Sequence, residues 1–288
     1  MYRVIRVSLL LLIAVSTVAQ RSDSLFVEQT LQQAPANAGT LYFARLFLGR
    51  PYVAHTLEVG DVEHLVVNTR QLDCTTLVEN VVALTLCARA GEHTYAAFCR
   101  QLMRLRYRQG VLDGYPSRLH YFSDWIADNQ QMRIVHEIQQ TSPPFTAVQT
   151  LHINYMSTHP HSYEALRRHP EFVEPIARQE HRLTGRRNRY IPKAEVKDTP
   201  VLRRCVHDGD IIAITCRKDG LDIAHLGFAV WRTDGLHLLN ASQLHKKVIE
   251  EPMTLGVYLS KHPSHTGIRV VRLESCQSAS GGVPPRTR

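Results

Sequence analysis

The chain has 288 residues and 34 Lys and Arg against 26 Asp and Glu, which gives a formal net charge of +8 at pH 7. This length is enough for one large domain or for a core domain with an insertion. A basic protein can bind nucleic acid, anionic lipid or an anionic polymer. The basic residues are not interleaved with aromatic residues in a recognition pattern, so we expect no nucleic-acid partner.

The first residues indicate the compartment. Arg3 and Arg6 precede an apolar run over residues 7–18 that ends in small residues. A run this short is typical of a cleaved secretory signal, since an uncleaved anchor would need a longer hydrophobic stretch. The sequence therefore predicts a signal peptide at 1–19, a single mature domain at 20–288, no stable membrane insertion, and export to the periplasm or cell envelope.

The N-terminal third is predicted to be helical. Apolar residues recur at helical spacing over residues 23–48, with a break near Pro35. A second apolar pattern predicts a largely buried helix over residues 75–90, with Asp73 or Cys74 at its start.

Residues 95–107 have the pattern of an amphipathic helix, and we expect its arginines to lie on a solvated face: Arg100, Arg104, Arg106 and Arg108. Regular periodicity fades over residues 110–200, where Gly, Pro, His and aromatic residues concentrate. Because few apolar residues cluster there, we predict a loop-rich insertion with short helices around 162–166 and 174–183. Long irregular segments are usually functional or disordered, and the aromatic residues favour an ordered wall of a substrate cleft.

The C-terminal third is predicted to be rich in strands. Short apolar runs bounded by turn residues occur at 210–215, 225–231, 236–239 and 267–272. An Asp-Gly pair at 234–235 predicts a tight hairpin between two of them. Helices first and an antiparallel sheet second indicate an α+β fold.

Six cysteines in an exported chain allow either three disulfides or one working thiol with five others. They are Cys74, Cys87, Cys99, Cys205, Cys216 and Cys276. Cys87 and Cys99 lie in apolar helical stretches, as ordinary buried thiols do. Cys205 and Cys216 flank a predicted strand and could pair.

Cys74 differs from the other cysteines because it opens a buried helix, whose N-terminus stabilises a thiolate. The chain has sixteen histidines, and His225 stands out because it begins an apolar strand. Asn240 on the next strand would hold the His225 ring by a hydrogen bond, which gives a Cys-His-Asn arrangement. A turn or strand-end role for Asn240 stays open, and His237 or His245 are alternative third groups.

Four sequence blocks carry a resemblance to a known family. They are Leu-Gly-Arg-Pro-Tyr-Val at 48–53, Leu-Asp-Cys-Thr-Thr-Leu-Val at 72–78, Gly-Asp-Ile-Ile at 209–212 with Ile-Ala-His-Leu-Gly-Phe at 223–228, and Leu-Asn-Ala-Ser at 239–242. In this order they resemble the NlpC-type, papain-like cell-wall cysteine hydrolases. The resemblance implies Cys74 as nucleophile, His225 as base and Asn240 as the group that orients the base, with Tyr52 and Asp73 beside the substrate. Thr75-Thr76 departs from the family's usual Ser-Gly.

The segments at 72–79, 118–125 and 190–193 are similar to one branch of that superfamily, the N-acetylmuramoyl-L-alanine amidase-like proteins. This resemblance implies hydrolysis of the amide between N-acetylmuramic acid and L-alanine, in peptidoglycan or in muropeptide fragments. We expect sugar or stem-peptide contacts from Tyr121, Ser123, Asp124 and Trp125. The alternative for Trp125 and Phe122 is that they pack the insertion onto the core.

Other functions remain open from the sequence. The same fold would serve a γ-D-glutamyl-diaminopimelate endopeptidase or a non-catalytic wall-binding module, and a Cys-His pair could also act as a transglutaminase. A metal-dependent hydrolase would need ligands, and His159-Pro160-His161 with His152 and His169 invites that hypothesis. Their spacing fits no strong zinc signature, so we predict neither a metal nor a cofactor.

Overall fold

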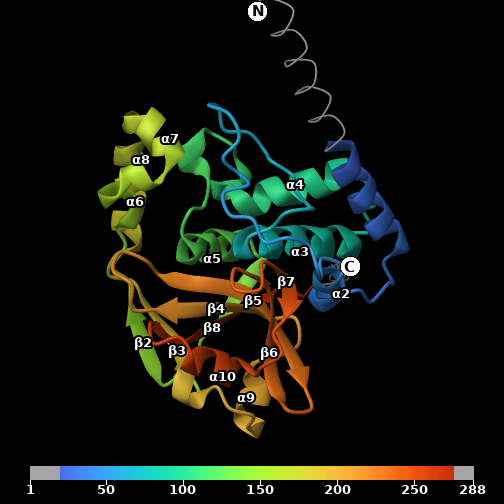
Figure 1. The fold of residues 1–288 in the computed structure, drawn as a ribbon, viewed down its shortest axis with the longest axis vertical. Helices are drawn as coiled ribbons and strands as arrows, with labels where there is room; N and C mark the ends of the chain where they lie inside the picture. Colours follow the sequence, from blue (N-terminus) through green and yellow to red (C-terminus); the bar gives the residue numbers. More distant parts are fainter. Residues whose placement is uncertain (1–19, 276–288) are drawn as a thin grey trace, which may run out of the picture.

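The computed structural model describes residues 20–275 (Figure 1). The predicted signal peptide at 1–19 and the cysteine at position 276 lie outside the described residues. No helix within 20–275 is long and apolar enough to cross a membrane. Residues 20–33 are helical and are followed by α2 (Thr40–Arg45), with the predicted break between them.

A mixed architecture of helices and one antiparallel sheet follows, which confirms the predicted α+β class. The other helices are α3 (Cys74–Arg89), α4 (Tyr95–Arg106), α5 (Phe122–Gln131), α6 (Tyr155–Thr158), α7 (Glu164–Arg168), α8 (Val173–Leu183), α9 (Pro200–Cys205) and α10 (Leu255–Ser260). The strands are β1 (Val135–Ile138), β2 (Ala147–Thr150), β3 (Arg187–Pro192), β4 (Ile211–Cys216), β5 (Ile223–Arg232), β6 (Gly235–Ser242), β7 (Lys247–Glu250) and β8 (His265–Leu273). The sheet order is β2-β3-β8-β4-β5-β6-β7, and β1 also pairs with β8.

Helices cover both faces of the sheet. Successive side chains of a strand point to opposite faces, and β4 shows this directly. Ile211 and Ala213 join the core that contains α3, α4 and α5, whereas Ile212 and Ile214 join the core beneath α9 and α10. Figure 1 shows the two helical layers on either side of the strands. Burial on both faces explains why β4 reads as a continuous apolar run.

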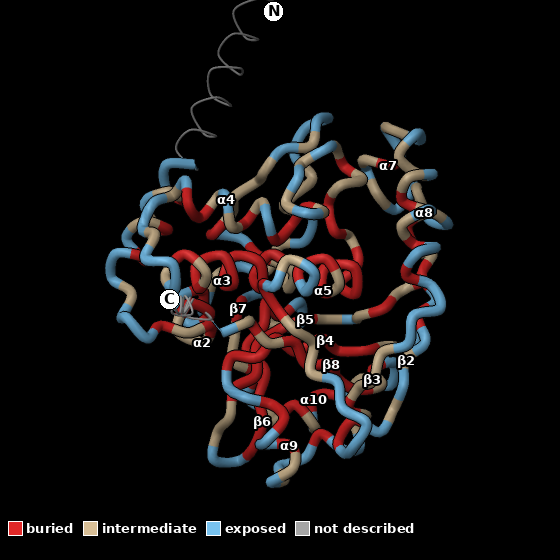
Figure 2. Tube along the Cα trace, turned by 180° about the vertical axis from the view of Figure 1, so that it is seen from behind, coloured by how far each residue is buried: buried red, intermediate tan, exposed pale blue. Residues whose placement is uncertain are grey.

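Helix α3 is deeply enclosed beside the sheet. Eleven of its sixteen residues are buried, and Figure 2 shows it as an almost continuous buried segment. A helix that is apolar around most of its circumference is stable only inside a protein. Its position against β5 and β6 is therefore fixed by packing on all sides.

Residues 110–200 contain more regular structure than their composition suggests. Helix α5 packs into the main core through Trp125, and both β1 and β3 pair with β8. These short strands lack a clear alternating pattern and owe their conformation to pairing with β8. The predicted helices around 162–166 and 174–183 correspond to α7 and α8. With α6 they form a lobe around a smaller core that includes Met156 and Ile176.

Arg106 corrects the expectation that all four arginines of the 95–107 helix and its end are solvated. Its side chain is 2% exposed, and its Nε donates to Glu79 Oε2 at 2.7 Å. Arg100 and Arg104 are exposed as expected, and Arg108 pairs with Asp124. The helical pattern could not reveal this, because the partner of Arg106 lies on α3, a different helix.

We expect Glu79→Ala to destabilise the fold by about 3–5 kcal/mol, because it leaves the Arg106 guanidinium buried without its counter-charge. Urea unfolding followed by circular dichroism measures the change. The matched control is Glu92→Ala, which breaks the exposed Arg100–Glu92 pair and should cost less than about 1 kcal/mol. Equal losses in the two variants would contradict the assignment.

Candidate active site

Cys74 is the first residue of α3, and a reciprocal capping interaction fixes this helix start. Asp73 Oδ1 accepts from the backbone N–H of Thr76 at 2.8 Å, and Thr76 Oγ1 accepts from the backbone N–H of Asp73 at 2.9 Å. Each group thereby satisfies one of the donors that a helix start leaves open. Thr76, one of the two residues that differ from the Ser-Gly of the NlpC-type proteins, thus has a structural role because it completes the cap.

His225 lies next to an irregularity in β5. Ile214 of β4 is opposite His225 while Thr215 is opposite Ile223, so Ala224 is an extra residue in β5. Such bulges bend a strand and change the direction of nearby side chains, and they occur often beside functional sites. His225 Nε2 lies 2.9 Å from Asn240 Oδ1 on β6, which confirms the expected hydrogen bond between adjacent strands.

The orientation of the Asn240 amide follows from its second partner. Asn240 Nδ2 donates to Glu251 Oε1 at 3.0 Å, and Glu251 is 1% exposed. A carboxylate only accepts, so the amide nitrogen must face Glu251 and the amide oxygen must face the imidazole. Asn240 Oδ1 then accepts a hydrogen bond from the N–H group at Nε2 of His225. The other ring nitrogen, Nδ1, is left as the basic one.

His237 and His245, the alternative third groups, have other partners. The His237 ring is fully buried, with Nδ1 2.8 Å from the backbone oxygen of Glu251 and Nε2 2.9 Å from Asp234 Oδ1. His245 Nε2 lies 3.3 Å from Glu251 Oε2. Neither is hydrogen-bonded to His225, so Asn240 is the one of these three candidates that contacts the imidazole.

Cys74 and His225 line the same cavity, whose volume is about 160 Å³. It lies between the start of α3, the start of β5 and the 110–200 region, which contributes Tyr121 and Tyr163. Asp222 is the one acidic residue among the described residues that line it. Both Cys74 and His225 are partly exposed, so a substrate can reach them.

The Cys74 thiol and the His225 imidazole are both uncharged in the free site. Burial, assisted by the Asp73 carboxylate, raises the pKa of the Cys74 thiol to about 12, although the Leu226 backbone and the Thr75 hydroxyl act in the opposite direction. Burial lowers the pKa of His225, and its hydrogen bond to Asn240 opposes that change. At neutral pH the imidazole is therefore unprotonated and can accept the thiol proton.

Three of the residues expected to contact substrate lie near Cys74 or line its cavity. Asp73 caps the helix that begins with Cys74. The charge of a Cys74 thiolate would raise the pKa of Tyr52, after burial the largest influence on it, so this ring lies close to the thiol. Tyr121 lines the cavity and donates its hydroxyl to Glu180 Oε1 at 2.6 Å.

The structure does not bring the other three to the cavity. Ser123 Oγ accepts from Arg269 at 2.6 Å, Asp124 pairs with Arg108, and Trp125 is fully buried and stacked on Phe122. All three lie in the first turn of α5. Trp125 thus has the packing role that was the alternative to a substrate contact.

Sequence reasoning missed Tyr163, Asp222 and Glu251. Tyr163 lies in the irregular lobe, where no periodicity marks it. Asp222 is 3% exposed and accepts from the backbone N–H groups of Ser123 and Ile223. Glu251 follows a short strand, β7, that we did not predict. Its neighbours are distant in sequence, so only the folded sheet reveals its partners.

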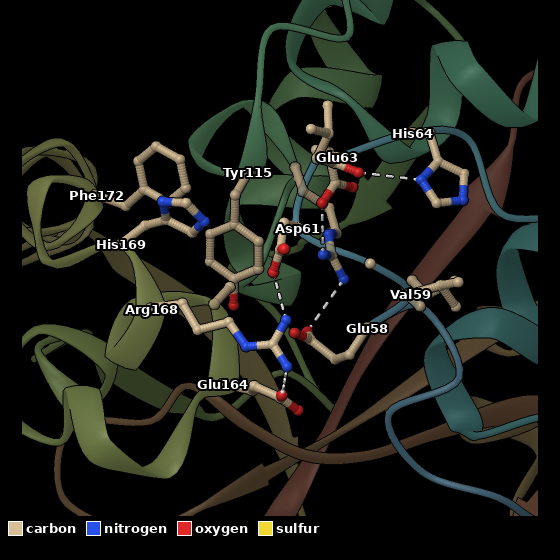
Figure 3. A pocket seen from close by; sticks show the side chains of 15 residues that line it. Glu58, Val59, Asp61, Glu63, His64, Tyr115, Glu164, Arg168, His169 and Phe172 are labelled. Carbon is tan, nitrogen blue, oxygen red and sulfur yellow. Dashed lines mark hydrogen bonds and ion pairs between the residues drawn. The ribbon is translucent and has the colours of Figure 1, made fainter. Parts of the chain in front are cut away.

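A second pocket, of about 70 Å³, is shown in Figure 3. It separates residues 57–64 from α7, and its charged groups are paired with one another. Arg168 binds Asp61 and Glu164, and Arg118 binds Glu58 and Glu63. Tyr115 lines this pocket and contacts the ring of His120, which lines the Cys74 cavity, at a centroid distance of 4.4 Å. The two pockets therefore share one wall.

The structure also describes the other cysteines and the histidine cluster. The five cysteines within 20–275 are free thiols, so the possible Cys205–Cys216 disulfide is not formed. No group of three His, Cys, Asp or Glu side chains in that part of the chain is arranged to hold a metal ion.

Comparison with known proteins identifies the family of the chain. A sequence model of the AmiA-like family, described as N-acetylmuramoyl-L-alanine amidase-like, matches residues 42–268. The chain belongs to this family. It is 40% identical to an N-acetylmuramoyl-L-alanine amidase from Bacteroides uniformis, with a TM-score of 0.76 over 82% of this chain and 98% of that one.

Two other solved structures are similar. A Bacteroides fragilis protein, to which a xylanase activity is assigned only by name, is 40% identical with a TM-score of 0.74 over 80% of this chain and 99% of that one. A Legionella pneumophila protein shares the fold at 21% identity and a TM-score of 0.70, over 91% of this chain and 96% of that one. A comparison with curated proteins gave no match.

We predict that His225→Ala slows alkylation of Cys74 by iodoacetamide at pH 7, because the thiol loses its proton acceptor. Mass spectrometry of the alkylated peptides measures the rate. His207→Ala, which removes an exposed histidine, is the control and should leave the rate unchanged. An unaltered rate in His225→Ala would show that the imidazole does not activate this thiol.

Proposed function

We propose that this protein is an exported cysteine amidase that hydrolyses the bond between N-acetylmuramic acid and L-alanine in peptidoglycan or its fragments. One observation carries the proposal. A cysteine at the start of a buried helix shares a cavity with a histidine whose Nε2 is held by Asn240, which leaves Nδ1 as the base. The family, and the amidase name of the Bacteroides uniformis structure, support the choice of bond.

The first half of the reaction transfers an acyl group to sulfur. His225 Nδ1 takes the Cys74 proton as Sγ attacks the lactyl carbonyl carbon, and the carbonyl oxygen becomes an oxyanion. The backbone N–H of Cys74 is one of the helix-start donors with no partner within the helix, and it can stabilise that charge. The imidazolium then protonates the alanine nitrogen, the C–N bond breaks, and the peptide leaves.

The second half releases the sugar. His225 removes a proton from a water molecule, which attacks the thioester carbonyl. The C–S bond breaks, the imidazolium protonates the thiolate, and the second product is the lactyl carboxylic acid, which ionises by releasing its proton to solvent. Each step needs His225 to exchange a proton through Nδ1 while Asn240 holds Nε2, so one ring orientation serves both halves.

The cavity argues against glycoside hydrolysis, the activity in the name of the Bacteroides fragilis relative. Most such enzymes place two carboxylates on either side of the glycosidic bond. Asp222 is the one acid among the described residues lining this cavity, and both of its oxygens accept backbone N–H groups. A paired acid and base for a sugar bond is therefore missing from the described cavity wall.

Export belongs to the same proposal. The segment at 1–19 has the pattern of a secretory signal, and peptidoglycan lies outside the cytoplasmic membrane. The formal net charge of +8, which is +6 without Arg3 and Arg6 of the 1–19 segment, suits a polymer whose stem peptides carry free carboxylates.

We expect the purified mature protein to convert an N-acetylmuramoyl-L-alanyl peptide into free muramic sugar and a peptide that begins with L-alanine. Mass spectrometry identifies the products. Cys74→Ala should form neither product above the uncatalysed rate, while Cys99→Ala, which removes a thiol away from the cavity, should remain active.

Two outcomes would replace the proposal. Cleavage inside the stem peptide that depends on Cys74 would make the protein an endopeptidase of the γ-D-glutamyl-diaminopimelate kind. Absence of cleavage from a folded wild-type protein would favour a non-catalytic wall-binding module.

The pH dependence follows from the site. Because burial lowers the pKa of His225, kcat/KM should stay high below pH 6.5 and fall only at more acidic pH. Asn240→Ala removes a hydrogen bond that favours the imidazolium, so it should shift this acid limb to lower pH. It should also reduce kcat by roughly 10²-fold, within the 10²–10⁴-fold range of a positioned base.

A pH–rate profile from pH 4 to 8 tests both effects, with the exposed Asn37→Ala as control. An acid limb that moves to higher pH in Asn240→Ala would refute the proposed hydrogen bond to the imidazolium.

A further inference from the structure

Glu251 is a buried acid with no role in the reaction steps above. It directly follows β7 and is 1% exposed. We propose that Glu251 is a positioning residue that fixes the amide of Asn240 and, through it, the proton-bearing nitrogen of His225. The consequence for catalysis rests on the proposed function, but the effect on the imidazole does not.

The backbone of Glu251 is held on both sides. Its N–H donates to the Leu238 backbone oxygen at 2.8 Å, and its own carbonyl oxygen lies 2.8 Å from Nδ1 of the fully buried His237. The position of the side chain is therefore set by β6, the strand that also carries Asn240. A residue anchored in this way can orient a neighbour without touching the substrate.

Asn240 alone cannot determine which ring nitrogen of His225 bears the proton. The two ends of an amide have nearly the same shape, and a flipped amide would present Nδ2 to the imidazole. His225 Nε2 would then have to accept, and its proton would move to Nδ1, the nitrogen needed as base. The carboxylate prevents this flip because it accepts from Nδ2 at 3.0 Å and cannot donate in its ionised form.

Glu251 also contributes charge. The charged and titratable groups that act on His225 are Asp73 at the start of α3, Glu251 after β7, His262 after α10 and His265 in β8. The two acids raise the pKa of His225 and His262 lowers it. Glu251 in turn lies 3.3 Å from His245, between Oε2 and Nε2. Removal of its charge alone should lower the pKa of His225.

Two substitutions separate the hydrogen bond from the charge. Glu251→Gln keeps an acceptor oxygen and similar volume but loses the charge, whereas Glu251→Met keeps the approximate volume and loses both. Glu250→Gln is the matched control, since the neighbouring acid pairs with Arg45 and Arg232 instead.

The first readout is the ring ¹⁵N spectrum of histidine-labelled full-length mature protein, with the His225 signals assigned from a His225→Gln sample. Wild type and Glu250→Gln should show the proton on Nε2 of His225. Glu251→Met should show the Nδ1-protonated form. Titration should give a lower pKa for His225 in Glu251→Gln than in Glu250→Gln.

The second readout is the pH profile of muropeptide hydrolysis. Glu251→Gln should shift the acid limb of kcat/KM to lower pH. Glu251→Met should reduce kcat roughly 10- to 100-fold with little change in KM, because part of the rate enhancement from the positioned base is lost. Glu250→Gln should change neither quantity. Thermal unfolding of each variant identifies losses that come from unfolding alone.

The outcomes separate the two proposals. A changed tautomer in Glu251→Met with no hydrolysis by wild type would support the positioning role and refute the amidase. Hydrolysis by wild type with an unchanged His225 tautomer and pKa in both Glu251 variants would overturn the positioning role. If Glu251→Met does not fold, an unchanged His225 pKa in folded Glu251→Gln overturns it as well.

Discussion

The capping interaction between Asp73 and Thr76 fixes where α3 begins, and the geometry of the site depends on that helix start. Cys74 is the next residue, so its position is set by the helix and by the packing that encloses the helix. The same core holds Leu226 and Phe228 of β5. A rigid, buried contact between helix and sheet therefore sets the positions of Cys74 and His225 in their shared cavity. A movable loop in either place would leave that geometry undefined.

A series of hydrogen bonds leads from His225 into the interior of the protein. The imidazole contacts Asn240, Asn240 contacts Glu251, and the backbone of Glu251 is held by β6. The donor and acceptor types match along these two contacts, since Asn240 Oδ1 accepts from His225 and Asn240 Nδ2 donates to Glu251 Oε1. The thiol, by contrast, is left protonated in the free site. Its activation is therefore linked to the imidazole at the moment of attack.

The positions of Cys74, His225 and Asn240 could be predicted from local sequence patterns. An Asp before an apolar helical pattern marks a helix start, and this located Cys74. Apolar runs with an Asp-Gly turn located β5 and β6 and so placed Asn240 beside His225. Patterns of this kind involve residues that are close in sequence, so they predict local structure without knowledge of the tertiary contacts.

Contacts between distant segments were not accessible. Nothing near Arg106 reveals Glu79, and nothing near Asn240 reveals Glu251. The segment at 122–125 shows the same limit in another way. Its polar and aromatic residues suit a saccharide, but only the folded chain shows that Trp125 packs inside. Pairing with β8 likewise gives order to strands in the 110–200 region that have no alternation of their own.

The most direct test of the account is to trap the acyl-enzyme. The protein would be mixed with an N-acetylmuramoyl-L-alanyl peptide, quenched in acid within the first turnovers, and analysed by intact and peptide mass spectrometry. The account predicts an N-acetylmuramoyl group, without any stem peptide, as a thioester on the fragment that contains Cys74. An adduct that carries stem-peptide residues, or continued hydrolysis by a Cys74→Ala protein, would contradict it.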